Sequence, residues 1–500
     1  MKYMKKLVLI VICLSAYIES SLYGQDQDSM SVSVSSGVLV SSQGFNPFYL
    51  VHNRLGKVKD HENTFLEGNI YFSKAFTSNW TFRTGGGIRN AKLYELFGSF
   101  LWRDFELFVG RKPEVLGGIE NNKLTTGSLA LGQNAIPITQ LNLSLKSFKA
   151  IPLTFNLLEF KGGISHGKFE RDRFVESPTL HQKYVSFRLN LEKEAGFKVS
   201  GSLIHIAQFG GITQNGDQLP NSFEDFLRVA TGRGIPGTII GQGGESNGLG
   251  NHMGITEYTL DIDIGKNSLL INAQKPFEDD GGMNYTPVKD LLVGVKLIRP
   301  DSKIRQLYLE FFQTIWQSGP GIPDRTDKYI TDEDNFGFKY GGRDDFYNNY
   351  LYQSGLTYQG RILSNPLFLT YNWSQNFEEP FANYENEIIN NRIRAFHFGS
   401  LIQASQDLLL RTMMTYSINY GTYAGLYEGR FAWEGIQTDP DFEYVFLGGK
   451  NQFYSLVEGV YDTQLFKQPV KLKAMLAGDF GQLYNNVGME LGIEFLLSSY

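Results

Sequence analysis

The sequence of 500 residues contains a single cysteine, Cys13, and that cysteine lies in the first apolar stretch of the chain. Because the rest of the sequence has none, neither a disulfide framework nor a thiol nucleophile is available there. No segment approaches the roughly 18 consecutive apolar residues that read as a membrane-spanning helix. The formal net charge of −6 offers no basic footprint for nucleic acid. These absences exclude disulfide-stapled domains, helical membrane proteins and nucleic-acid binders.

The first residues have the pattern of an export signal. Three lysines precede a short apolar core that runs from Leu7 to Ala16, which is too short to span a membrane and is typical of a secretory signal peptide. Cys13 follows Ile12, where a lipoprotein signal requires a small residue, so lipidation is not expected. We expect cleavage after Gly24, which divides the chain into a signal peptide (1–24) and one mature domain (25–500).

What the sequence has in abundance is glycine, with 54 residues, and aromatic residues, at 14%. Apolar residues recur at every second position in many segments, which predicts strands rather than helices. The same period appears around Val34, between Tyr350 and Tyr358, and around Tyr416. The clearest case lies near the C-terminus, where one face carries Val487, Met489, Leu491, Ile493, Phe495 and Leu497 and the other Gly488, Glu490, Gly492 and Glu494.

The spacing of the connections favours a membrane barrel over a soluble sandwich. Tight turns are predicted at 78–79 and 103–104, whereas long polar stretches cover 214–251, 278–285, 318–345 and 377–390. Short turns on one rim and long loops on the other are typical of outer-membrane barrels. The sequence therefore predicts an all-β protein, a transmembrane antiparallel β-barrel of about 18 strands (range 16–20) with one or more short helices in its loops.

One loop helix has clear end signals. Ser222 stands at a capping position with Asp225 three residues later, and Gly232 follows as a terminator. Phe223, Phe226 and Leu227 would share one face. We interpret this helix as a lid or packing element of the barrel mouth, with contact to a polysaccharide as the alternative.

Patterns for catalysis and metal binding are weak. Residues 163–167 match G-x-S-x-G, but that motif works at a strand-to-helix turn of an α/β fold; a barrel lipase would pair Ser165 with His181 or His205. The seven histidines show no metal-binding spacing. The acidic clusters 278–280 and 332–334 lack the EF-hand spacing, and the glycine-rich run 241–250 lacks the lysine of a phosphate loop. We expect no catalysis, no metal and no cofactor.

Sugar binding would use aromatic rings beside side chains that bond hydroxyl groups. Four tryptophans are candidates, although girdle positions at the membrane interface are the simpler expectation for each: Trp102, Trp316, Trp373 and Trp433. Basic residues in long loops would meet an acidic polysaccharide: Arg228, Arg233 and Arg343. The segment with His52, Asp60, His61 and Glu62 is interpreted as a solvated loop.

Several runs resemble the Bacteroidetes branch of the capsule assembly protein Wzi family. They are LFVGRKPEVLG (107–117), FKGGISHGKFE (160–170), LHQKYVSFRL (180–189), HIAQFGG (205–211), PNSFEDFLRVATGRG (220–234), LGNHMG (249–254), YNNYLYQSGLTYQGR (347–361) and NNRIRAFHFG (390–399). They are scattered from residue 107 to 399 in the order of the family.

The resemblance implies an outer-membrane barrel that acts as a surface lectin, anchors capsular or other surface polysaccharide and has no catalytic reaction. The runs bring forward as polysaccharide-binding residues Arg111, His166, His181, Arg228, His252, Glu278 and Asp279. The implied partners are surface polysaccharide, outer-membrane lipid and the barrel-assembly machinery, with the protein itself a monomer. The alternative is an outer-membrane channel or transporter for sugars or hydrophobic small molecules. The helical bundle that better-characterised members carry at their N-terminus has no counterpart between QDQDS and the strand-like SVSVSSGVLV.

Overall fold

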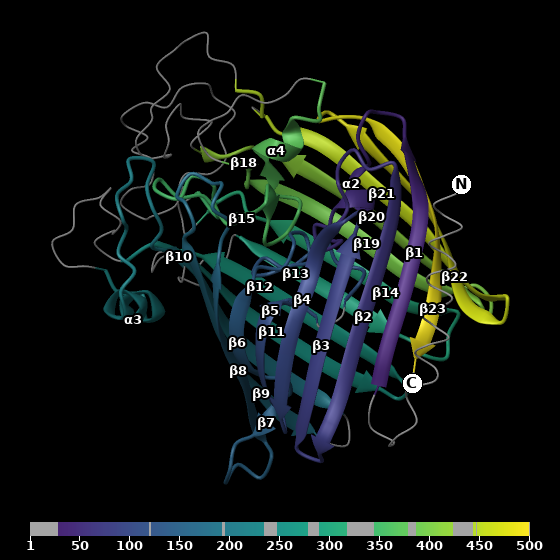
Figure 1. The fold of residues 1–500 in the computed structure, drawn as a ribbon, viewed down its shortest axis with the longest axis horizontal. Coiled ribbons are helices and arrows are strands. Elements are labelled where there is room, and N and C mark those ends of the chain that lie inside the picture. The colour runs from purple at the N-terminus through teal and green to yellow at the C-terminus, as the bar shows by residue number, and fades with distance from the viewer. Residues whose placement is uncertain are drawn as a thin grey trace.

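The chain forms a closed antiparallel β-barrel of 18 strands in a computed structural model (Figure 1). The structure describes residues 29–119, 122–192, 196–234, 248–278, 290–317, 345–378, 387–423, 444–446 and 448–499. The barrel closes because β1 (Ser29–Ser41) pairs with both β2 (Thr64–Thr77) and β23 (Asn486–Ser499). The predicted fold class is therefore confirmed; the predicted signal peptide lies outside the described residues.

The remaining wall strands follow one another around the barrel in chain order. They are β3 (Trp80–Arg89), β4 (Lys92–Trp102), β5 (Phe105–Arg111), β6 (Gln140–Leu145), β7 (Lys149–Ala150), β8 (Leu158–Lys168), β9 (Thr179–Glu192), β10 (Phe197–Phe209), β11 (Asn251–Ile264), β12 (Asn267–Phe277), β13 (Leu291–Ile298), β14 (Ile304–Gln313), β19 (Ile393–Gln403), β20 (Leu408–Asn419), β21 (Lys450–Leu465) and β22 (Gln468–Gly481). Both β6 and β7 pair with β8, so together they form one interrupted wall strand.

The two-residue period separates a lipid-facing surface from the lumen. On β23 the side chains of Val487, Met489 and Leu491 are exposed on the outside, whereas Glu490 between them is 2% exposed. On β20 Met414 is likewise exposed and Thr415 is buried. Because neighbouring side chains on a strand point to opposite faces, each wall strand offers apolar groups to lipid and polar groups to the interior. No helix within the described ranges has the length and apolar character needed to cross a membrane.

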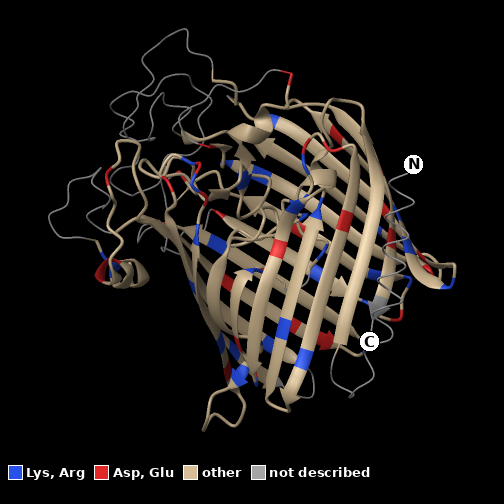
Figure 2. Cartoon of the chain, in the orientation of Figure 1, with Lys and Arg blue, Asp and Glu red and all other residues tan. Residues whose placement is uncertain are grey.

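The two rims differ as the sequence predicts. Tight turns at 78–79 and 103–104 join wall strands at one rim, where Arg103 takes a positive φ of 54°. Trp80 and Trp102 are both exposed near this rim, with ring centroids 6.1 Å apart, so Trp102 has the girdle position expected of it. Charges of both signs gather beside β7 at the same rim (Figure 2). The long connections lie at the opposite rim, which is the extracellular side in barrels of this kind.

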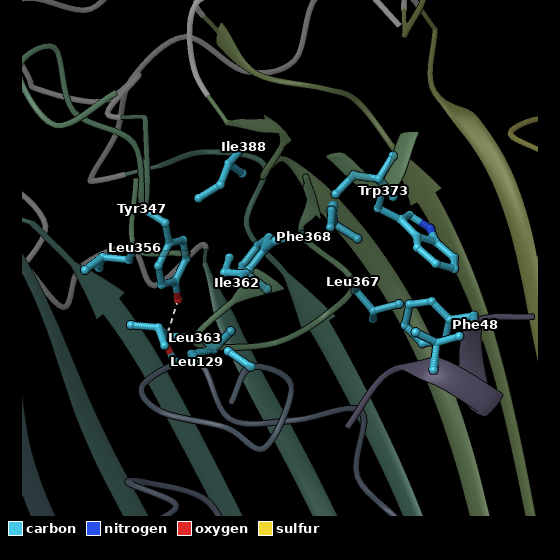
Figure 3. Close-up of a cluster of buried hydrophobic side chains, with 14 of the residues drawn as sticks. Phe48, Leu129, Tyr347, Leu356, Ile362, Leu363, Leu367, Phe368, Trp373 and Ile388 are labelled. Carbon is cyan, nitrogen blue, oxygen red and sulfur yellow. Dashed lines mark hydrogen bonds between the residues drawn. The ribbon is translucent and has the colours of Figure 1, made fainter. Parts of the chain in front are cut away.

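Loops from the long-connection rim fold into the barrel and fill its upper interior. This lumen insert comprises residues 42–63, 112–119, 122–139, 345–378 and 387–392. Its short elements are α2 (Phe48–Val51), β15 (Thr357–Tyr358), β16 (Arg361–Ile362), β17 (Leu369–Thr370), α4 (Tyr371–Ser374) and β18 (Ile388–Asn390). Buried side chains from its separate segments pack into one hydrophobic cluster (Figure 3).

The insert corrects one sequence-based prediction. The alternating segment from Tyr350 to Tyr358 was expected to be a wall strand, yet only its last two residues form a strand, β15. Residues of both faces are buried there, including Tyr352, Gln353 and Leu356. Since alternation reports only that a segment has two different faces, it does not distinguish a wall strand from an extended segment packed inside the barrel.

Candidate functional site

A polar cleft of about 430 Å³ opens at the long-connection rim. Three parts of the insert build it: the chain just after β1, the chain just before β2, and α4. Its lining consists of Gln43, Gly44, Phe45, Asp60, His61, Asn372, Gln375 and Asn376. Amide, carboxylate and imidazole groups beside an aromatic ring are the side chains that bind sugar hydroxyl groups and ring faces. We call this feature the mouth cleft.

The polar groups of the mouth cleft are held in place by hydrogen bonds. The Asn376 amide donates to Oδ2 of Asp60 over 3.1 Å, and the Arg361 guanidinium forms an ion pair with Oδ1 of the same carboxylate. His61 donates from Nδ1 to the carbonyl of Gly44 over 2.7 Å. Asn372 on α4 and Gln375 at its C-terminal end remain exposed. The cleft therefore combines a fixed carboxylate with amides that are accessible to a ligand.

Aromatic side chains support the cleft from below. Trp373 on α4 is buried, with its ring 5.6 Å from that of Phe45 and edge-on to it. Tyr484, from the β22–β23 connection, lies 5.4 Å from Phe45 and stacks on Phe377 at 4.5 Å. The buried position of Trp373 shows that it is an internal packing residue rather than a membrane-girdle residue. These contacts hold α4 against the start of the insert.

Buried ion pairs tie the insert to the wall. Arg89 on β3 donates to Glu62 in the insert and to Glu67 on β2, over 2.8 Å in each case. Arg54 of the insert forms a salt bridge with Glu490 on β23. The interpretation of this segment as a solvated loop is wrong for His52 and Glu62, which are buried within the barrel, whereas His61 is exposed.

Burial also changes proton affinities within the insert. Burial, together with the nearby Arg361 guanidinium, holds the pKa of His52 well below its usual range. His52 contacts Asn134 over 2.8 Å and lies against the Trp373 ring. Burial raises the pKa of Glu114 to about 7, although Gln140 donates to its carboxylate over 2.7 Å. His52 is therefore neutral and cannot serve as a cationic group near neutral pH.

A second constellation lies on the outside of the barrel. His166 on β8, His181 on β9, His205 on β10 and His252 on β11 form a histidine row across four adjacent strands. Nδ1 of His166 lies 3.2 Å from Nδ1 of His181, and Nε2 of His205 lies 2.8 Å from Nδ1 of His252. These positions share the parity of the outward residues Ile164 and Leu203. The row therefore belongs to the outer face of the wall.

The helix predicted from Ser222 exists and covers this row. It is α3 (Phe223–Thr231), with a reciprocal capping box between Ser222 and Asp225 and a left-handed Gly232 at its end. The Phe226 ring packs 4.8 Å from His166 and 5.5 Å from His181. Contrary to the interpretation of a mouth lid, α3 rests on the outer wall beside β10 (Figure 1).

The seven residues brought forward by the resemblance do not meet in one place. His166, His181 and His252 lie in the histidine row, and Arg228 lies on α3 with its guanidinium 2.7 Å from Glu224. Arg111 ends β5 at the long-connection rim, where it donates to the hydroxyl of Tyr358 in the insert over 3.3 Å.

One of the two acidic residues among the seven lies at a third location. Glu278 follows β12, and Asp279 lies outside the described residues. The six that the structure describes are thus divided between the outer wall, the rim near the insert and the end of β12.

The G-x-S-x-G match has no hydrolase geometry. Ser165 lies within β8 rather than at a strand-to-helix turn, and its hydroxyl donates to Oε1 of Gln182 over 3.1 Å. The imidazole of His166 contacts the backbone carbonyl of Ser165, not its hydroxyl. This arrangement overturns the barrel-lipase alternative, which required a histidine base at Ser165.

Sequence reasoning did not bring forward as binding residues the lining of the mouth cleft or His205, one member of the histidine row. Gln43, Asn372, Gln375 and Asn376 carry no motif, and their association depends on how segments 42–63 and 345–378 fold together. His205 lies in the run HIAQFGG that carries part of the resemblance, so parity on neighbouring strands was the signal that could have joined it to His181. Within the described ranges, no group of three or more histidine, cysteine, aspartate or glutamate residues is placed to hold a metal ion.

Comparison with known proteins agrees with this architecture. A family model described as capsule assembly protein Wzi matches residues 15–368. Among curated protein sequences no significant match is found. Among solved structures, Wzi, an outer-membrane protein involved in group 1 capsule assembly in Escherichia coli and described as a carbohydrate-binding β-barrel, is similar with a TM-score of 0.52. The two share 13% identity over 93% of this chain and 83% of that chain.

Two further solved structures, one of them a porin by name, are similar with lower scores. OccK5 (OpdH) from Pseudomonas aeruginosa has a TM-score of 0.45 at 10% identity, covering 94% of this chain and 97% of that chain. A BenF-like porin from Pseudomonas fluorescens has a TM-score of 0.46 at 7% identity, covering 95% and 99%. Similarities this weak support no inference about function.

Fold and comparisons together define the class as an outer-membrane β-barrel. Because the family model matches well over half of the sequence, the chain belongs to the capsule assembly protein Wzi family.

Proposed function

We propose that this protein is a non-catalytic, lectin-like barrel that binds capsular or other surface polysaccharide at its extracellular mouth, anchors it and aids capsule assembly. The mouth cleft carries the proposal, because it presents Asp60, Asn372 and Gln375 at the rim where a surface polymer arrives. A repeating polymer would bind through many weak contacts whose combined strength exceeds that of any one of them. Family membership is the second support.

The filled upper lumen favours anchoring over transport. Buried side chains of the lumen insert, among them Phe48, Tyr347 and Phe368, belong to one hydrophobic cluster in the barrel interior (Figure 3). A channel would instead need a polar path lined by accessible side chains. The channel or transporter for sugars or hydrophobic small molecules is the opposing outcome of the experiment below.

Our proposal also covers the export, the membrane insertion and the oligomeric state of the protein. We infer export through a signal peptide cleaved after Gly24, insertion of residues 25–500 as one domain by the barrel-assembly machinery, and a monomer in the outer membrane. The seven residues brought forward by the resemblance remain predictions as sugar ligands. Contact between His181 and a polysaccharide would require α3 to leave the wall, because Phe226 covers that imidazole.

Deletion of the gene, followed by measurement of cell-bound and released capsule, tests the function. We expect capsule to be released into the medium, and re-expression of an Asn372→Ala, Gln375→Ala variant to restore retention only partly. A matched control is Gln406→Ala, in the exposed β19–β20 turn at the opposite rim. Unchanged capsule retention with loss of small-solute uptake would overturn anchoring in favour of the channel.

A further inference from the structure

Helix α3 is capped at both ends and packs against the outside of the barrel. Val229 is buried in a small apolar cluster with Ala207, Phe209 and Leu249. The Lys183 ammonium donates to the carbonyl of Ala230 near the C-terminal end of the helix, where a cation is favoured by the helix dipole. The capping box and these contacts fix both the length of α3 and its position on the wall.

The docking place is continuous with the lipid-facing surface of the barrel. Moving toward the opposite rim, the next outward residue on β8 after His166 is Ile164, on β9 after Lys183 it is Val185, and on β10 after His205 it is Leu203. All three are exposed on the outer face. Such outward apolar side chains are the part of a membrane barrel that contacts acyl chains. Helix α3 therefore lies directly at the edge of the surface that contacts lipid.

The apolar side of α3 extends beyond the part that touches the wall. At about 100° per residue, Phe226, Val229 and Ala230 form the wall-facing arc, and Phe223 and Leu227 continue it on one side. Phe223 is 74% exposed and Leu227 is 47% exposed.

The rest of the helix circumference is polar. It carries Glu224, Asp225, Arg228 and Thr231, and charges of both signs mark α3 in Figure 2. The apolar arc is thus half covered by protein and half uncovered.

We propose that α3 is an interfacial membrane anchor, with Phe223 and Leu227 inserted among the lipids of the outer leaflet beside β8–β11. Lipid is the occupant that the structure favours, because the uncovered arc adjoins the lipid-facing belt and the opposite arc is polar. An amphipathic helix of this kind lies in the plane of the interface, with its charged face toward the headgroups and water. The anchor keeps α3 at the membrane surface, and it operates whether or not the mouth cleft binds polysaccharide.

Site-directed fluorescence tests the anchor in the whole protein. In a Cys13→Ala background the chain has no cysteine, so an environment-sensitive dye can be placed with Phe223→Cys, Leu227→Cys or Glu224→Cys. Leu309→Cys on the outer face of β14 gives the lipid reference, and Asn215→Cys in an exposed loop gives the water reference. The labelled proteins are folded into phosphatidylcholine vesicles with or without a spin-labelled lipid quencher.

We expect dyes at 223 and 227 to emit at the wavelength of the lipid reference and to be quenched several times more strongly than the dye at 224. Emission and quenching at 223 and 227 that match the water reference would overturn the anchor and indicate a surface for a soluble partner. Equal quenching at 223, 224 and 227 would also overturn it, because an interfacial helix must be asymmetric. The dye is placed at both 223 and 227 because a dye could disturb the packing of the helix at one position, and the other position would still report the environment.

Discussion

Arg89 on β3 donates from Nε to Oε1 of Glu62 over 2.8 Å, and both side chains are almost fully buried inside the barrel. The same guanidinium reaches Glu67 and lies 3.8 Å above the Phe65 ring. One wall residue thus fixes the end of the 42–63 segment that carries Asp60 and His61. The positions of Asp60 and His61 in the mouth cleft therefore depend on the buried guanidinium of Arg89.

Replacing Arg89 with Met should destabilise the lumen insert. The variant leaves Glu62 without its buried cation, and removal of one member of a buried ion pair typically costs about 3–5 kcal/mol. We expect a loss of roughly 3 kcal/mol in the free energy of unfolding, measured by urea titration in vesicles, and faster proteolysis within 42–63. The control is Arg83→Met on the same strand and face, where the side chain is exposed. Equal stability of the two variants would show that the ion pair does not hold the insert.

Tyr347→Phe tests how two separate segments of the insert are joined. The buried Tyr347 hydroxyl donates to the carbonyl of Leu129 over 2.6 Å (Figure 3). Its loss leaves that carbonyl without its tyrosine donor in an apolar cluster, at a cost of about 1–3 kcal/mol. Hydrogen exchange of residues 124–132 should accelerate, whereas Tyr416→Phe on the outer face should change nothing. Unaltered exchange in the Tyr347 variant would contradict this role.

Phe226→Ala should release α3 from the wall. The variant removes the ring that packs against His166 and His181, and truncation of a packed phenylalanine costs up to about 3–5 kcal/mol. In detergent we expect trypsin to cut after Arg228 and Arg233 several times faster than in the wild type. Thr231→Ala is the control, because that side chain is exposed on the polar side of α3. Cleavage at the same rate in both variants would mean that Phe226 does not attach the helix.

Local patterns in the sequence were sufficient to predict the strands of the barrel wall and the helix α3. The alternation around Leu491 and Glu490 belongs to β23 itself, since each residue of a strand faces one side only. The ends of α3 were equally readable, because Ser222 caps a helix through an atom three residues away and Gly232 ends it with a left-handed backbone. Such features need no knowledge of distant contacts.

The mouth cleft and the histidine row could not be predicted from such local patterns. The mouth cleft joins Gln43 and Asp60 of segment 42–63 to Asn376 of segment 345–378, and they meet only because both segments enter one lumen. The histidine row depends on register, since shifting β9 by one residue would turn His181 from the outer face to the lumen. Alternation between Tyr350 and Tyr358 misled for a related reason, because the interior of a filled barrel buries both faces of an extended segment.

Glu114→Gln should remove part of the pH dependence of stability. Burial raises the pKa of Glu114 from an ordinary 4.5 to about 7, so between these values the folded protein holds a proton that the unfolded chain has released. A raised folded-state pKa gives stability that is complete below about pH 4.5 and is lost as pH rises through about 7. Asp345 and Glu387, whose pKa values burial also raises, act in the same direction.

The glutamine keeps an oxygen that can accept from Gln140 and does not titrate. We therefore expect the wild type to lose roughly 2 kcal/mol more than the variant in unfolding free energy between pH 5 and pH 8. Urea titrations at a series of pH values measure the difference, with Glu224→Gln on the exposed side of α3 as the control. Parallel stability curves for the wild type and the Glu114 variant would show that this carboxyl is ionised equally in the folded and unfolded states. A difference that appears only above pH 5 and levels off beyond pH 7 would assign the buried proton to Glu114.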